Sequence, residues 1–249
     1  MVARFCILAV LLQSAVAVAA SYDDMRAAAM ARCQKIDPAE YQTGLFFNPD
    51  GYRSYYVRSE CFQRTAVEFR DPALCAEVKR RYALFSSSWG YSSAHCRELV
   101  ADGMAADRTR LEETKNRYNE APLRLSEFRV ERNGNGRDFD IIPSFTGAYG
   151  HGYVLRFEIV QPENGGAGVP LHSAGYYVDA NSRLRIFLRQ DDVRKRFPQF
   201  ALERLYPVCA TIILNIGTGG PSGWWSDAFI EKVFPLQERS HSIERQLRF

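Results

Sequence analysis

Cysteines suggest the first kind of chemistry in this sequence, disulfide formation. Five of them follow the N-terminal apolar segment, at Cys33, Cys61, Cys75, Cys96 and Cys209. No two have the C-x₂₋₄-C spacing of a structural zinc site, so zinc is the weaker alternative. The first four form an even set, and we predict that neighbours pair, Cys33 with Cys61 and Cys75 with Cys96. Spacing does not exclude Cys33–Cys75 with Cys61–Cys96, and Cys209, in an apolar run, is expected to behave as a small hydrophobe.

Paired aromatic residues suggest the second kind of chemistry, ligand binding. Trp89 and Tyr91 lie in a serine-rich loop, and Trp224 and Trp225 follow the glycine-rich stretch 217–223. Large aromatic side chains beside flexible turns can form a recognition surface, so these four residues are the candidate binding site. The alternative is that they cap the hydrophobic core. The glycine-rich stretch lacks the Lys-Ser/Thr of a phosphate-binding loop, and we interpret it as a connection between strands.

No catalytic constellation is visible. The chain has four histidines, and none has metal-ligand spacing to a neighbour. His95 adjoins Cys96, but that cysteine belongs to the even set, and His151 lies among glycines typical of a turn. There is no G-x-S-x-G motif, and the carboxylates are scattered. The sequence therefore predicts no catalytic residue, no metal and no cofactor.

Charge and composition exclude several classes of protein. Lys and Arg number 32 against 29 Asp and Glu, a formal net charge of +3 without basic clusters. Phosphate binding requires a concentrated positive surface, so nucleic acid is not an expected partner. An apolar content of 46% with 24% charged residues is that of a globular protein rather than a disordered one.

The N-terminus has the layout of a secretory signal peptide. Arg4 precedes an apolar run from Phe5 to Leu12, and small residues continue to Ala20. A transmembrane anchor is the alternative, but the apolar run is shorter than the ~20 residues that a bilayer requires. We expect residues 1–20 to be removed and the remaining chain to be soluble in the periplasm or secreted, with no stable membrane insertion.

Residues 21–121 read as a helical, disulfide-bonded domain. Aspartates followed by alanines predict a helix over 21–36, and apolar spacings of seven, four and three predict another over 52–70. Asp71 and Pro72 read as the cap and first residue of a third helix, with Cys75, Val78, Tyr82 and Phe85 on one face. A long helix is expected over 94–120.

Residues 122–249 change to a period of two, which is typical of strands. Alternating segments are centred on 123–130, 139–142, 153–160, 175–178 and 184–188, and residues 133–136 (Asn-Gly-Asn-Gly) predict a hairpin turn. The run 208–216 is apolar nearly throughout, which predicts a central strand. We also expect a helical turn or two within 191–205, a last good strand at 229–234, and a charged tail or weak strand from 237 onward.

The predicted fold class is therefore α+β, an N-terminal disulfide-bonded helical domain followed by an antiparallel β-sandwich-like domain. The favoured function is an exported, non-enzymatic protein that binds a protein or cell-envelope component. One alternative is a secreted hydrolase, possibly directed at glycans, with an unrecognised carboxylate site. Another is a periplasmic immunity or inhibitor protein.

Overall fold

The computed structural model describes residues 21–43, 54–79, 91–161, 168–216, 219–220 and 223–249. The chain divides into two compact units, each of which is described by itself. The helical unit contains the described residues up to Glu113 together with Gly217–Val233, and the β unit contains Thr114–Ile216 and Phe234–Phe249. The segment 217–233, which follows most of the strands in sequence, thus packs with the helices.

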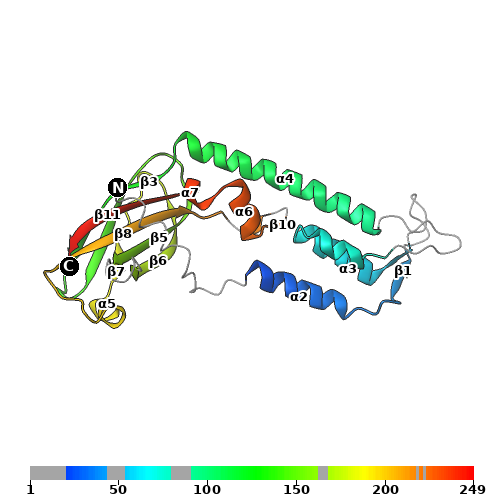
Figure 1. The fold of residues 1–249 in the computed structure, drawn as a ribbon, viewed down its shortest axis with the longest axis horizontal. Helices are drawn as coiled ribbons and strands as arrows, with labels where there is room; N and C mark the ends of the chain where they lie inside the picture. Colours follow the sequence, from blue (N-terminus) through cyan, green and yellow to red (C-terminus); the bar gives the residue numbers. More distant parts are fainter. Residues whose placement is uncertain (1–20, 44–53, 80–90, 162–167, 217–218, 221–222) are drawn as a thin grey trace. The chain divides into compact units, whose positions relative to one another are not determined.

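The described part of the helical unit contains four α-helices, one 3₁₀ helix and two small pairs of strands (Figure 1). Its elements are α2 (Tyr22–Gln34), β1 (Tyr41–Thr43), β2 (Ser54–Tyr56), α3 (Val57–Glu68), the 3₁₀ helix η2 (Pro72–Glu77), most of α4 (Ser93–Glu120), β9 (Gly219–Gly220), β10 (Gly223–Trp224) and α6 (Asp227–Val233). Strand β1 pairs with β2, and β9 with β10, both antiparallel. Helix α2 begins at a capping box in which Ser21 and Asp24 bond each other's backbone N–H groups.

Two disulfides hold this unit together. They join Cys33 to Cys61 and Cys75 to Cys96, which confirms the predicted pairing of neighbours. The buried cluster around them consists of Cys33, Phe62, Ala66, Leu74, Cys75, Val78, Cys96 and Val100. Half-cystines therefore make up a large part of a small core.

The β unit contains two antiparallel sheets (Figure 1). One has the order β11-β8-β5-β6, from β11 (Ser240–Arg248), β8 (Leu205–Leu214), β5 (His151–Val160) and β6 (Gly168–Val178). The other has the order β3-β4-β7, from β3 (Arg124–Arg132), β4 (Phe139–Thr146) and β7 (Ile186–Leu188). The short helices α5 (Gln190–Arg196) and α7 (Leu236–Arg239) complete the unit.

Aromatic side chains join the two sheets face to face. Phe128 of β3 meets Phe157 of β5 edge-on, with ring centroids 5.6 Å apart. Phe139 of β4 packs edge-on against Phe249 at the C-terminus, at 5.4 Å. This arrangement of two antiparallel sheets around one core confirms the predicted α+β class with a sandwich-like β part.

Strand β8 occupies the centre of its sheet, between β11 and β5, as predicted from its apolar run. Its residues are buried on both faces from Val208 to Leu214. Cys209 is a buried thiol in this strand, with its Sγ 3.9 Å from the hydroxyl of Thr211. Its neighbours on that face are thus partly polar, although the sequence around it is apolar.

Two predicted elements were wrong in type or extent. Residues 229–234 lie largely in helix α6, where the Ser226 hydroxyl accepts from the Phe229 N–H, so the segment is not a strand. Asp71 caps the next element as predicted, but that element is the 3₁₀ helix η2, and Val78 is already extended. Tyr82 and Phe85 lie outside the described residues. At the C-terminus, where the sequence left a tail or a weak strand open, the strand is observed: β11 pairs with β8 along all nine of its residues.

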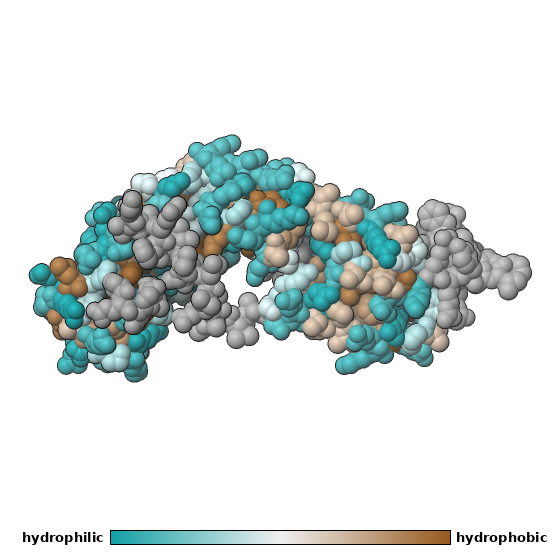
Figure 2. Space-filling view, viewed as in Figure 1, coloured by the Kyte–Doolittle hydropathy of each residue, from teal (hydrophilic) through white to brown (hydrophobic). Residues whose placement is uncertain are grey.

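Polar residues dominate the face of the molecule shown in Figure 2, and apolar residues reach that face only in small patches. Among the described residues, no helix is long and apolar enough to cross a membrane. Residues 1–20, with the predicted signal peptide, lie outside the described part of the chain.

Candidate functional site

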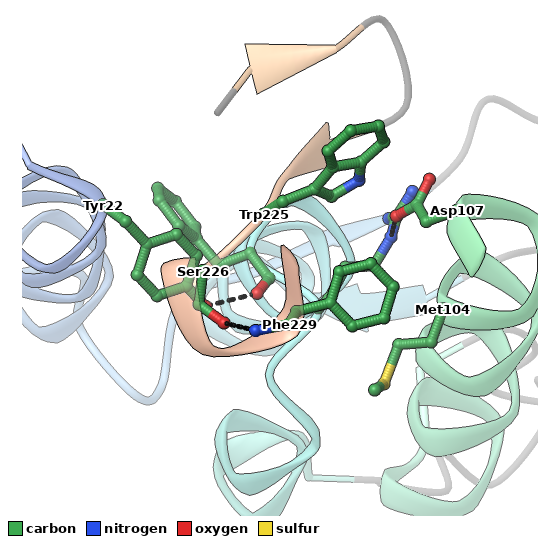
Figure 3. Close-up of a pocket in the computed structure, with 8 residues that line it drawn as sticks. Tyr22, Met104, Asp107, Trp225, Ser226 and Phe229 are labelled. Atoms are coloured by element: carbon green, nitrogen blue, oxygen red, sulfur yellow. Dashed lines mark hydrogen bonds and ion pairs between the residues drawn. The ribbon is translucent and has the colours of Figure 1, made fainter. Parts of the chain in front are cut away.

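A small cavity in the helical unit brings together side chains that are far apart in sequence (Figure 3). Its volume is about 60 Å³, and four aromatic rings supply most of its wall. The lining residues are Tyr22 of α2, Phe69 and Arg70 after α3, Met104 and Asp107 of α4, and Trp225, Ser226 and Phe229 at the start of α6. Because one water needs about 10–15 Å³, the cavity has room for about four heavy atoms.

A buried ion pair forms the charged side of this cavity. The Arg70 guanidinium donates through Nε to Asp107 Oδ2 at 2.6 Å, and the Asp107 side chain is fully buried. Arg110 bonds the other carboxylate oxygen, and Arg70 also donates to the Val67 carbonyl. Both oxygens of the one carboxylate are therefore engaged by arginines.

The backbone around the ion pair is adapted to Arg70. Its φ of 53° lies in the left-handed region, which is unusual for a residue with a side chain. Gly103 of α4 leaves the space that the guanidinium fills, because a Cβ there would lie 2.7 Å from Arg70 Cζ. Without a side chain at position 103, helix α4 passes close to the arginine and Asp107 reaches it.

The aromatic wall is fixed by hydrogen bonds and ring contacts. The Tyr22 hydroxyl donates to the Phe69 carbonyl at 2.6 Å, and the two rings meet edge-on. Burial raises the pKa of Tyr22, with a further increase from the nearby Asp71 carboxylate, so the phenol stays protonated and remains a donor. On the opposite side Trp225 lies beside Phe229, with ring centroids 6.4 Å apart.

Trp225 carries a buried donor without an acceptor. Its Nε1 atom is inaccessible to solvent, and no described residue accepts a hydrogen bond from it. Figure 3 shows the indole nitrogen on the edge of the ring that faces Asp107, while the Phe229 ring faces Met104. An orphaned buried N–H costs about 1–3 kcal/mol, so an acceptor that reaches the indole after the neighbouring side chains shift would relieve that cost.

The groups around this cavity can recognise a ligand. The aromatic rings and Met104 offer an apolar surface, while Arg70 and the Trp225 indole offer donors. The Asp107 carboxylate is engaged by two arginines, and the hydroxyl of Ser226 accepts from the α6 backbone. A cation would meet the Arg70 charge, so the cavity suits a neutral, mainly apolar group that carries one acceptor.

The carboxylate pair required by the hydrolase alternative is not found in either cavity that we describe. The aromatic cavity is lined by one carboxylate, and a second, more open cavity in the β unit by none. Burial raises the pKa of Glu158 on β5, an effect that the nearby Arg156 opposes, but this residue lines neither cavity. No observation therefore favours a glycosidase-like site.

The four aromatic residues proposed from sequence are placed differently. Trp225 lines the aromatic cavity. Tyr91 is half-buried and packs against the disulfide cluster. Trp224 belongs to β10, but its side chain lies outside the described part of the chain, as does Trp89 altogether.

The remaining residues of the cavity carried no local signal in the sequence. Tyr22, Arg70, Met104 and Asp107 belong to three separate segments and meet only in the folded unit. The role of Gly103 beside Arg70 likewise required the structure. Among the described residues, no group of His, Cys, Asp and Glu could hold a metal ion.

Comparisons with known proteins do not extend this description. No protein family, no curated protein and no solved structure matches this chain.

Proposed function

We propose that this protein is an extracytoplasmic binding protein and that its helical unit holds a partner protein through the aromatic cavity. The observation that carries the proposal is the orphaned indole N–H of Trp225, a residue that lines the aromatic cavity. A partner that brings an apolar group and a carbonyl oxygen would bury the apolar group in the cavity. Its carbonyl oxygen would accept a hydrogen bond from the indole N–H.

The size of the cavity favours a protein anchor over a small metabolite. Pockets for small molecules commonly have volumes of about 300–1,000 Å³, whereas this one has a volume of about 60 Å³. Interfaces between proteins often depend on one or a few side chains that enter small, well-packed pockets. A leucine, valine or methionine side chain has the required three to four heavy atoms, and its own backbone carbonyl supplies the acceptor.

The two disulfides support the extracytoplasmic part of the proposal. Cys33–Cys61 and Cys75–Cys96 are both embedded in the core of the helical unit. Structural disulfides persist in oxidising compartments, such as the periplasm or the exterior of the cell, and are rare in the cytosol. Together with the signal-like segment 1–20, they favour export.

Capture from an envelope extract tests this proposal. A benzophenone amino acid placed at Met104, at the cavity, should crosslink a specific protein, and Trp225→Ala should abolish that product. Leu202 in the β unit is the matched control position, because its exposed fraction of 37% equals that of Met104. The proposal fails if both positions give the same products, or if Trp225→Ala leaves the Met104 product unchanged.

The identity of the captured protein then separates the subclasses of binding. A constitutive envelope protein would indicate a structural or assembly role. A toxin delivered from outside would instead indicate the immunity function considered from the sequence.

A further inference from the structure

The β unit contains a second cavity, an open groove of about 680 Å³. Its lining comes from two stretches of chain and one further side chain. These are residues 142–145 of β4, residues 180–185, and Arg129 of β3. Its volume is much larger than that of the aromatic cavity, and its walls are mostly backbone and polar side chains.

The groove arises because two paired strands part. The pairing of β4 with β7 runs from Phe139↔Leu188 to Ile141↔Ile186 and ends there. Strand β4 continues to Thr146, paired with β3 on its other side. The chain that precedes Ile186 leaves the ladder and forms a turn in which Ser182 N–H donates to the Asp179 carbonyl. Beyond Ile141, one edge of β4 therefore has no strand neighbour among the described residues.

The backbone groups on this edge can be identified from one hydrogen bond. The Ser126 hydroxyl donates to the Ser144 carbonyl at 3.0 Å, so the backbone of Ser144 faces β3. Since successive residues of a strand point their backbone groups to opposite sides, Pro143 and Phe145 face the groove. Pro143 offers a carbonyl alone, and Phe145 offers both an N–H and a carbonyl. The proline limits strand addition to a short segment, because it removes one donor from the edge.

The side chains around the groove carry a surplus of positive charge. Arg129, Arg183 and Arg185 line it, and no carboxylate does. The Nη1 atom of Arg185 lies 3.3 Å from Oδ2 of Asp140 and 3.5 Å from Oε2 of Glu131. The Nε atom of Arg129 lies 2.9 Å from Oε1 of the same Glu131. Exposed Arg183 forms no ion pair among the described residues. Arg129 and Arg185 thus share two carboxylates, and the charge of Arg183 leaves a place for an anionic side chain.

We propose that this groove binds an extended peptide segment with acidic side chains, contributed by a partner protein. The segment would add a short strand to β4 through the Pro143 carbonyl and both backbone groups of Phe145. One of its side-chain rows would meet Arg183 and Arg185, and the half-buried Ile142 and Leu184 would contact the apolar residues between. This site is separate from the aromatic cavity and does not depend on the function proposed for it.

Fluorescence anisotropy with a dye-labelled hexapeptide of alternating valine and glutamate tests the proposal on the intact protein. We expect saturable binding, and we expect the lysine counterpart of the peptide not to bind. Arg183→Glu should weaken binding about tenfold or more, since it places a like charge against the peptide. Arg137→Glu is the matched control, because Arg137 is exposed in the β3–β4 hairpin and does not line the groove.

Backbone methylation distinguishes strand addition from loose charge attraction. A peptide that is N-methylated at alternate residues keeps its charges but loses donors, so its binding should fall to the background level. Equal binding of the methylated and unmethylated peptides, or complete displacement by millimolar phosphate, would overturn the proposal. Trp225→Ala should leave peptide binding unchanged, so the outcome here is independent of the aromatic cavity.

Discussion

Removal of a disulfide should destabilise the helical unit and spare the β unit. The bridges span sequence separations of 28 and 21 residues. In the chain-entropy treatment these loops correspond to about 3.6 and about 3.3 kcal/mol, or about 7 kcal/mol for both. A typical domain is stable by about 5–15 kcal/mol. Three of the eight residues in the buried cluster of this unit are half-cystines, so little other core remains to compensate.

The positions of the tryptophans make this prediction measurable unit by unit. Trp225 lies in the helical unit, and the stretches 114–216 and 234–249 of the β unit contain no tryptophan. Indole fluorescence during urea unfolding therefore reports on that unit, and hydrogen exchange along β8 reports on the other. The variants are Cys33→Ala with Cys61→Ala, and Cys75→Ala with Cys96→Ala. Each pair should lower the unfolding free energy seen by fluorescence by about 3 kcal/mol.

The buried thiol of Cys209 in the β unit provides the control for the disulfide variants. Cys209→Ala changes a buried thiol of β8, so it should alter exchange in that strand and leave the fluorescence transition in place. An unchanged fluorescence midpoint in both disulfide variants would refute the argument that the bridges stabilise the unit. Faster exchange in β8, in step with the fluorescence change, would show that the two units unfold as one.

Three further predictions concern single positions. Gly103→Ala gains about 1 kcal/mol of helix propensity but pushes the Arg70 guanidinium away from Asp107, at a cost of about 1.5–3 kcal/mol because Arg110 still bonds that carboxylate, so urea unfolding should show a net loss of about 0.5–2 kcal/mol. Gly147→Ala should destabilise the β unit in thermal melts, because φ is 110° and a Cβ would lie 2.3 Å from the Pro122 carbonyl oxygen. Burial lowers the pKa of His172 and His241, with smaller effects from Arg196 and Arg124, so the unfolded chain takes up protons first as pH falls. Stability of the β unit should therefore be complete above pH ~6.5 and decrease below it, and a double His→Gln variant should reduce that decrease.

Local rules predicted many of the elements. The aspartates near the start of α2 indicated a helix N-terminus, and the Asn133–Gly136 turn joins β3 to β4, where Gly136 has a φ of 67°. The apolar run of β8 correctly indicated a central strand, since both of its faces are covered. In each case the determining interactions lie within a few residues or within one strand.

The missed elements show where residue type misled the interpretation. Phe229, Ile230 and Val233 favour strands by type, yet their spacing also fits one face of a helix, and Ser226 supplies the cap that decides for α6. For β11, the charged residues left a tail and a weak strand both open, because a strand needs an apolar side chain at few positions when half of its residues face outward. Pairing with β8 supplies the backbone bonds that order it.

The candidate site was harder to predict because it is assembled entirely by tertiary structure. Its residues come from α2, the end of α3, α4 and the start of α6. The sequence indicated Trp225 through its type and its glycine-rich surroundings. Nothing local indicates that Arg70 meets Asp107 or that Gly103 leaves room for the pair.

The indole N–H of Trp225 provides the most direct test of the central claim. An ¹⁵N correlation spectrum should contain one indole signal for each of the three tryptophans, and Trp225→Phe identifies the relevant one. Titration with N-acetyl-leucine methylamide, which carries an isobutyl group and carbonyl oxygens, should shift that signal saturably, with a dissociation constant of about 1 mM, as suits so small a ligand. The other two indole signals should stay in place. A Trp225 signal that does not move, or equal shifts of all three, would contradict the proposal that this cavity is a binding site.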